Sequence, residues 1–334
     1  MREDYNHIKN ESVDAVITWV DGGDIEHRKK RIEALKESSS VDQFSVPTGT
    51  DSTRFIDNGE LRYCIKSIRK FAPWVRNIYL VTDKQVPEFL TKEVQSRYKV
   101  TIVDHSEVFK SFEWALPTFS SRTIESVLWR IPNLAPRFIY FNDDFVITKH
   151  VQPTDFFRDG KVVLRGSWSS MTRYGWLRLK LNNLVSFAAK KLLGITRSMH
   201  LLLQIKSAQL AGFNDRYFRS PHVPHPIHTN TLRRFFCENR SLFEQNIQYQ
   251  FRNTEQFSAI FLANHLEIKN NSAVLQNADD AMMINGEMDF LPVIKRKLEK
   301  ISEDKVRFVC LQGLERFKQK HRRHIELTLN GQFE

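Results

Sequence analysis

The sequence has few cysteines, and their arrangement excludes a disulfide framework. The 334 residues contain three cysteines, an odd number, and they lie far apart at Cys64, Cys237 and Cys310. That spacing also fits no zinc knuckle, so a disulfide-stapled or zinc-ribbon fold is excluded. We expect three reduced, buried thiols of the kind found in cytosolic proteins.

Long apolar runs are also missing. The first residues, MREDYNHIKNES, are charged and lack the apolar core of a secretory signal. No stretch reaches the roughly 18 consecutive apolar residues that would cross a bilayer. The expected location is therefore the cytoplasm.

Familiar nucleotide and nucleic-acid fingerprints are absent as well. There is no P-loop and no GxGxxG motif, and no helix-turn-helix, RRM or zinc-finger pattern. Lys+Arg 50 against Asp+Glu 39 nevertheless leave a net charge of +11. This surplus favours an anionic partner such as a nucleotide, a phosphorylated sugar or an acidic membrane surface, and we expect no nucleic-acid partner.

What the sequence does contain is an alternation of strand and helix patterns. Short β-branched, apolar runs with polar or acidic C-terminal ends occupy 13–20, 76–83, 99–104 and 137–144. Apolar residues at helical spacing occupy 61–71 and 124–131 between them. This order predicts an α/β fold with a Rossmann-like (GT-A-like), mainly parallel sheet, helices on both faces, and sites at the carboxyl ends of the strands.

The domain organisation follows from the same patterns. We predict a single α/β catalytic domain over 1–334, with a basic helical insertion at 168–215 and a C-terminal strand and basic helix at 305–334. The basic residues between 173 and 206 are interleaved with Leu and Phe. They suit an anionic membrane face or polyanion, and they equally suit the solvated side of an ordinary helix.

The sharpest local feature is Asn142-Asp143-Asp144, which directly follows a predicted buried strand. Adjacent carboxylates repel each other unless a cation or solvent neutralises them. Oxygen ligands of this kind suit Mg²⁺, which keeps several waters and bridges to substrate phosphates. Taken alone, the same residues would also form a solvated turn.

Two further segments have both a structural and a functional interpretation. The turn after the first strand, with Asp21 and Gly22, is either a simple tight turn or a place where the backbone meets a nucleotide. Asn58 and Glu60 suit the start of a helix. The guanidinium of Arg62 has the geometry to bind a phosphate, and Arg62 could equally well be an ordinary surface residue.

His222 lies in a proline-restricted segment, 220–226, that cannot be regular helix. A histidine on such a loop is a candidate general base or acid near neutral pH. His225 and His228 follow it, so a metal site is an alternative, although no Cys or His-x-x-x-His pair accompanies them. Arg252 follows on a polar stretch that we expect to be helical.

Together these residues resemble a known family, the Stealth proteins. The run 14–22 resembles its first conserved region, and 55–85, 116–126 and 138–144 resemble the second. Residues 221–225 with Arg252 resemble the third. Residues 308–311 resemble a short part of the fourth region. They are followed by Gln312-Gly313, where the family often has Asn-Asp.

The family comprises bacterial capsule polysaccharide phosphotransferases and the animal N-acetylglucosamine-1-phosphotransferase. The resemblance implies an enzyme that transfers a hexose- or N-acetylhexosamine-1-phosphate from a UDP-sugar to a sugar hydroxyl of a capsular polysaccharide, releasing UMP. It implies Mg²⁺, or alternatively Mn²⁺, as cofactor, a phosphate-linked glycan as acceptor, and possible contact with the inner face of the cell membrane. The rival interpretation is a GT-A-type glycosyltransferase that releases UDP.

The resemblance also implies roles for individual residues. Catalytic roles fall to His222, Arg252, Asp144 and Glu125, and metal binding to Asp143 and Asp144. The implied substrate-binding residues are Asp21, Gly22, Asp57, Asn58, Glu60, Arg62 and Asn142.

Overall fold

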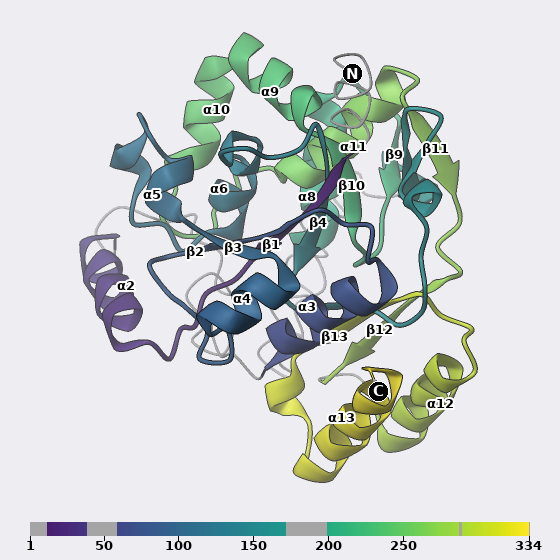
Figure 1. The fold of residues 1–334 in the computed structure, drawn as a ribbon. Coiled ribbons are helices and arrows are strands. Elements are labelled where there is room, and N and C mark those ends of the chain that lie inside the picture. Colours follow the sequence, from purple (N-terminus) through teal and green to yellow (C-terminus); the bar gives the residue numbers. More distant parts are fainter. Residues whose placement is uncertain (1–11, 39–58, 172–198, 287–288, 334) are drawn as a thin grey trace, which may run out of the picture.

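The central feature is a five-stranded sheet with the strand order β10-β4-β1-β2-β3 (Figure 1). The computed structural model describes residues 12–38, 59–171, 199–286 and 289–333. Strands β1, β2, β3 and β4 pair in parallel, and β10 pairs antiparallel with β4. The predicted mainly parallel α/β sheet is thereby confirmed.

The elements of the main sheet have the following bounds. Its strands are β1 (Val13–Thr18), β2 (Ile78–Thr82), β3 (Val100–Asp104), β4 (Arg137–Asn142) and β10 (His225–His228). The remaining strands are β5 (Phe145–Ile147), β6 (Phe157–Arg158), β7 (Lys161–Arg165), β8 (Ser167–Ser170), β9 (Arg216–Arg219), β11 (Ala273–Gln276), β12 (Ala281–Asn285) and β13 (Phe308–Gln312).

Helices cover both faces of the main sheet, as predicted, and the last two helices pack beside β12 and β13 (Figure 1). Their bounds are α2 (Ile25–Ser38), α3 (Glu60–Phe71), α4 (Lys92–Tyr98), α5 (His105–Val108), α6 (Ser121–Glu125), α8 (Met199–Leu210), α9 (Thr229–Glu238), α10 (Arg240–Ile247), α11 (Ala259–Lys269), α12 (Leu291–Ser302) and α13 (Gln319–Phe333). Alternate residues of β1 pack into two different hydrophobic clusters. Ala15 and Ile17 pack with α3, whereas Val16 packs with α9, α10 and α11.

The main sheet contains a fully buried carboxylate, Asp14 on β1. Arg76 donates to both of its oxygens, from Nε at 2.9 Å and from Nη2 at 2.6 Å. The backbone N–H groups of Asn77 and Ala135 donate to it at 3.1 and 2.8 Å. Asp14 therefore links the starts of β1, β2 and β4, and its burial is compensated by these bonds.

We expect Arg76→Met to lower the free energy of unfolding by about 3 kcal/mol, because it leaves the Asp14 charge buried without its cation. Arg234→Met is the matched control, since Arg234 forms an exposed i,i+4 pair with Glu238; it should leave the free energy of unfolding nearly unchanged. Urea unfolding of both variants measures the difference. Equal losses would show that the buried pair contributes no more than a surface one.

Several predicted boundaries need correction. The pattern at 124–131 does not form one helix: α6 ends at Glu125, and a short 3₁₀ turn covers Leu128–Arg130. The polar stretch expected to be helical is not, because α10 ends at Ile247 and α11 begins only at Ala259. Arg252 lies in that non-helical break. The terminal helix begins at Gln319 because Gly313, with a positive φ of 72°, starts a separate 3₁₀ turn.

The predicted basic insertion is only partly within the described residues. Of its basic positions, Lys206 on α8 is described, whereas Arg173, Arg178, Lys180, Lys190, Lys191 and Arg197 lie outside the described residues. Lys206 Nζ donates to the carbonyl of Thr254 and lies 3.6 Å from the Glu255 carboxylate. α8 is therefore bound to the protein core at this point. Among the described helices, none is both long and apolar enough to cross a membrane.

The cysteines differ in their exposure. All three are free, as expected, and Cys64 and Cys310 are buried. Cys237 is exposed on α9, which corrects the expectation of three buried thiols. It falls on the outer side of α9, whose buried residues are Thr229, Leu232 and Phe236.

His265 of α11 joins the helix to the neighbouring strand β9. The N–H of Phe218 donates to its Nε2 at 3.0 Å. Its Nδ1 must then carry the proton, which it donates to the Phe261 carbonyl at 2.7 Å. Burial lowers the pKa of this imidazole to about 4, so the neutral form belongs to the folded state.

This arrangement predicts acid sensitivity. The unfolded chain takes up a proton at His265 near pH 6.5, whereas the folded protein resists it down to about pH 4. Stability is therefore lost as the pH falls through this window, by about 2 kcal/mol between pH 7 and pH 5. His265→Gln should remove that part of the pH dependence of unfolding, whereas His324→Gln, at an exposed site, should keep it. Identical pH profiles for wild type and His265→Gln would contradict the assignment.

Candidate active site

The strand pairing brings the predicted acidic turn and the histidine loop to one edge of the sheet. Thr18, the last residue of β1, pairs with Asn142, the last residue of β4. Because β10 is antiparallel to β4, its first residue, His225, pairs with Tyr140 near that same end. The loop before β10, which carries His222, therefore lies beside Asp143 and Asp144.

Asp144 of the acidic turn is fixed through both its backbone and its side chain. Its carbonyl accepts from Leu311 N at 2.8 Å, and its Oδ2 accepts from the Cys310 thiol at 3.3 Å. Its Oδ1 is buried and has no hydrogen-bond partner among the described residues. Burial raises the pKa of this carboxyl, and the nearby His222 partly offsets the rise. The carboxylate thus retains an unused, water-excluded oxygen.

His222 is the imidazole that lies near Asp144. Burial lowers the pKa of its imidazole, and the Asp144 charge acts in the opposite direction. The ring stacks on His200 with centroids 4.2 Å apart and planes at 21°. The Phe145 ring meets it edge-on at 6.5 Å. A neutral imidazole held between rings and beside a carboxylate is suited to accept a proton.

Glu125, at the end of α6, belongs to the same cluster. The Ser258 hydroxyl donates to its Oε2 at 2.7 Å. Burial raises the pKa of this carboxyl to about 7, against the opposing effects of Ser258 and Arg122. This value places its protonation change near neutral pH.

Tyr140 shows that the three carboxyl groups face a common region. The pKa of its phenol is raised well above the usual value, first by burial, and then by the charges of Glu125, Asp143 and Asp144. Its hydroxyl donates to Asn142 Oδ1 at 2.6 Å and lies 3.1 Å from Thr18 Oγ1. From the sequence, the position of Tyr140 predicts only a strand residue.

Arg252 is attached to the first residue of the helix that ends at Glu125. Its Nη2 donates to the Ser121 hydroxyl at 2.6 Å. The neighbouring Arg122 donates from Nη1 to the carbonyl of Asn253 at 2.6 Å and so holds the segment that carries Arg252. The half-buried guanidinium therefore sits at one end of α6 and the Glu125 carboxylate at the other.

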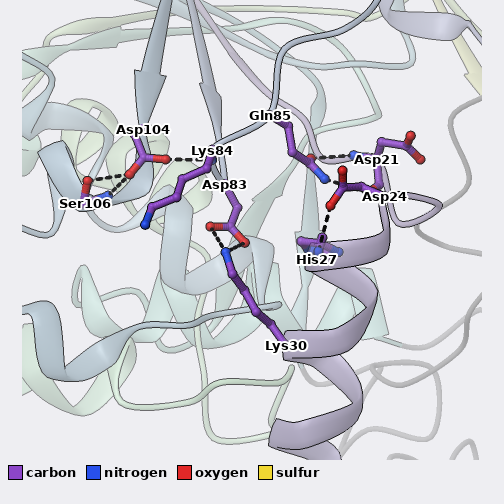
Figure 2. A network of polar contacts seen from close by, with 9 residues as sticks. All are labelled: Asp21, Asp24, His27, Lys30, Asp83, Lys84, Gln85, Asp104 and Ser106. Atoms are coloured by element: carbon purple, nitrogen blue, oxygen red, sulfur yellow. Dashed lines mark hydrogen bonds and ion pairs between the residues drawn. The ribbon is translucent and has the colours of Figure 1, made fainter.

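The turn after β1 is fixed to the loop after β2 (Figure 2). Gln85 brackets Asp21: its Oε1 accepts from Asp21 N at 2.9 Å and its Nε2 donates to Asp21 O at 2.8 Å. Asp24 Oδ1 accepts from His27 N at 2.8 Å and starts α2, and Lys30 forms an ion pair with Asp83 at 3.0 Å. Asp21 and Gly22 are thus held rigidly at the carboxyl edge, one strand away from Asn142.

The remaining predicted residues lie near the start of α3 or outside the described part. The Cys64 thiol contacts the Asn142 carbonyl at 3.7 Å, which places the first turns of α3 at the carboxyl edge. Glu60 is buried there, and the Arg62 guanidinium lies 5.1 Å from the centroid of the Phe89 ring. Asp57 and Asn58 lie outside the described residues.

The three histidines of the loop and β10 do not share a ligand position. His225 Nδ1 pairs with Asn264 Nδ2 at 3.2 Å, and His228 Nδ1 lies 3.0 Å from Glu267 Oε1. In the part of the chain that is described, no group of three or more His, Cys, Asp or Glu is arranged to hold a metal. A metal held by these histidines is therefore not supported.

Asp143 and Asp144 fit a different kind of metal site. Mg²⁺ is commonly held by one or two carboxylates, with waters and substrate phosphates completing the shell, so it needs no cage of protein ligands. The buried, unpartnered Oδ1 of Asp144 is the oxygen that such an ion would satisfy. The donor set thus suits Mg²⁺ when a phosphate is present.

Sequence reasoning missed the residues that support this cluster. Cys310 and Tyr140 come from strands whose apolar pattern indicated only a core position. His200 and Gln204 come from α8, within a segment that appeared only basic and helical. Cys310 could have been suspected, because the strand that carries it matched the fourth conserved region.

The fold is that of an α/β protein whose candidate site lies at the carboxyl edge of the main sheet, and comparisons with known proteins identify its family. The model for Stealth protein conserved region 2 matches residues 54–164, and that for conserved region 1 matches residues 11–39. The receptor polysaccharide phosphotransferase WefC of Streptococcus oralis is 33% identical over 258 residues, which cover 72% of this chain and 74% of the relative. The capsular polysaccharide phosphotransferase cps1A of Actinobacillus pleuropneumoniae is 39% identical over 153 residues, 46% of this chain and 40% of the relative.

The chain therefore belongs to the Stealth family, and it is an enzyme of the transferase class. Among solved structures, the galactosyltransferase LgtC in complex with donor and acceptor sugar analogs aligns with a TM-score of 0.38 at 10% identity, over 89% of this chain and 86% of that one. So low a score leaves the family assignment resting on the sequence matches. The resemblance of 221–225 and 308–311 to the third and fourth regions stays a prediction.

Proposed function

We propose that this protein transfers a sugar-1-phosphate from a UDP-sugar to a sugar hydroxyl of a capsular or exopolysaccharide, with release of UMP. The observation that carries the proposal is the strand pairing of β10 with β4, which brings the His222 loop to the acidic turn, where Asp144 Oδ1 is buried without a partner among the described residues. It supports phosphoryl transfer because a proton acceptor and a candidate metal-binding oxygen lie together. The named relatives are polysaccharide phosphotransferases.

The chemistry assigns one task to each residue. His222 takes the proton of the acceptor hydroxyl as that oxygen forms a bond to the sugar-bearing phosphorus. The bond from this phosphorus to the bridging oxygen breaks, and UMP leaves with the electron pair. Arg252 supplies fixed positive charge to the phosphate oxygens, where charge accumulates.

The acidic residues act on the donor side. Asp143 and Asp144 would hold Mg²⁺, or Mn²⁺ in its place, which when bound neutralises charge on the diphosphate. Glu125 orients toward the same region, and its pKa of about 7 allows it to adjust its protonation to the charge of the bound substrate. Asn142, Asp21 and Gly22 would line the donor pocket, together with Glu60, Arg62, Asp57 and Asn58.

The acceptor in this proposal is an anionic, phosphate-linked glycan, drawn by the net charge of +11. The enzyme acts in the cytoplasm, with peripheral contact at the inner face of the membrane where such polymers grow. The named sugar of the donor, for example N-acetylglucosamine, is an outcome of the assay below.

The test is a product assay. Purified protein with Mg²⁺ is incubated with a panel of UDP-sugars and capsule oligosaccharides, and nucleotides are separated by chromatography while ³¹P NMR follows new phosphodiesters. We expect UMP and a phosphodiester. Release of UDP with no new phosphodiester would overturn the proposal in favour of a glycosyltransferase.

A further inference from the structure

We propose that one face of α8 positions both His222 and Glu125 for the transfer reaction, through His200, Gln204 and Ser207. The inference rests on the proposed function, which gives His222 and Glu125 their roles. The three residues are spaced i, i+4 and i+7, so they lie on the same side of the helix. Each of them contacts a different part of the active-site cluster.

His200 supports the ring of His222. The two imidazoles stack with centroids 4.2 Å apart and planes at 21°. On its other side His200 meets the Phe261 ring edge-on at 5.1 Å. Its Nδ1 lies 3.1 Å from Gln204 Nε2, and because an amide nitrogen only donates, Nδ1 is the acceptor. The orientation of the supporting ring is therefore fixed from within α8.

Gln204 fixes the backbone that leads into His222. Its side chain is fully buried. Its Oε1 accepts from Ser220 N at 2.8 Å, and its Nε2 donates to Ser220 O at 3.0 Å. Together with the bond to His200, every hydrogen of this amide is used. Pro221 follows with a restricted φ, so fixing Ser220 also fixes the direction in which the chain enters His222.

Ser207 connects the same helix face to Glu125. Its hydroxyl donates to Ser258 O at 2.9 Å and lies 3.3 Å from Ser258 N, which donates to it. The hydroxyl of Ser258 in turn donates to Glu125 Oε2 at 2.7 Å. One rigid helix thus sets the position of the proton acceptor and of the carboxyl group on the two sides of the cluster.

Such positioning matters because a loop cannot hold a catalytic ring by itself. A misplacement of about 1 Å can lower turnover about 10²-fold while the substrate still binds. We therefore expect loss of the α8 contacts to act on the turnover number rather than on donor binding.

The experiment compares Gln204→Met with Gln209→Met. Both place the same side chain on α8, but Gln209 is exposed and points away from the cluster. Gln204→Met should lower kcat between about 10- and 100-fold, with KM for the UDP-sugar within about twofold, whereas Gln209→Met should match wild type. Gln204→Glu retains the acceptor for Ser220 N and should recover part of kcat. A Gln204→Met enzyme with wild-type kcat would overturn the proposal.

Two further measurements test the role of α8 independently of kcat in Gln204→Met. Ser207→Ala changes little volume and carries the test should Gln204→Met fail to fold; it should lower kcat about 10-fold, and an unchanged kcat would count against the role of α8. Hydrogen exchange at the Ser220 amide should accelerate at least about 10-fold in Gln204→Met and stay unchanged in Gln209→Met. If wild type releases no UMP while the exchange at Ser220 changes as expected, the proposed function fails, but the proposal that Gln204 fixes the Ser220 backbone stands. Unchanged exchange in Gln204→Met would refute the proposal that Gln204 fixes the Ser220 backbone.

Discussion

Asp144→Asn lowers the turnover number on the order of 10³-fold. The Cys310 thiol donates to Asp144 Oδ2, Leu311 N donates to the backbone carbonyl of Asp144, and Oδ1 is buried without a partner in the described structure. Asparagine retains the size of the side chain but removes the negative charge. The oxygen that remains therefore binds a cation much more weakly.

The matched control is Asp279→Asn, which makes the same change at an exposed position. It should retain wild-type turnover. UMP release is measured for both variants over a range of Mg²⁺ concentrations, alongside their thermal unfolding midpoints. An Asp144→Asn enzyme that works within about threefold of wild type, with the same response to Mg²⁺, would remove Asp144 from the mechanism.

His222→Ala lowers turnover by about 10²- to 10⁴-fold and leaves the dissociation constant for the UDP-sugar nearly unchanged. The reason is that the ring lies beside Asp144, and burial lowers its pKa, which keeps it neutral and able to accept the proton of the acceptor hydroxyl. Turnover comes from UMP release, and donor affinity from equilibrium titration in the absence of acceptor.

Two companion variants separate chemistry from packing. His222→Phe keeps a flat ring against His200 and Phe145 but has no nitrogen. It should be as inactive as His222→Ala if the proton transfer is what matters, whereas restored turnover would assign His222 a packing role. His324→Ala, at an exposed site, should behave like wild type. A loss confined to donor affinity would make His222 a phosphate ligand instead of a base.

The core sheet could be predicted because its information is local. Each parallel strand is a short apolar run with a polar end, and the carboxyl edge follows from the alternation with helices. Asn142 and Asp143 were found in this way. That the loop carrying His222 lies beside them could not be predicted in this way, because the pairing of β10 with β4 joins residues far apart in sequence, and no local pattern indicates which strands are neighbours.

The supporting residues were hidden for a second physical reason. Gln204 and Ser207 look like ordinary polar residues of a helix, and only burial against the His222 loop and Ser258 gives them a role. Arg252 was expected on a helix because the residues around it are polar and have helical propensity. Tertiary bonds such as that from Arg122 to Asn253 hold the segment in another conformation.

The three thiols differ in exposure, so a thiol reagent should modify only one of them in the folded protein. Cys64 and Cys310 are fully buried against the end of β4, and burial raises the pKa of each thiol well above its usual value. Thiolates are the reactive form, so both should resist alkylation in the folded state. Cys237 is exposed on α9. A maleimide dye should therefore attach at this one thiol of the native enzyme without touching the residues that carry the chemistry.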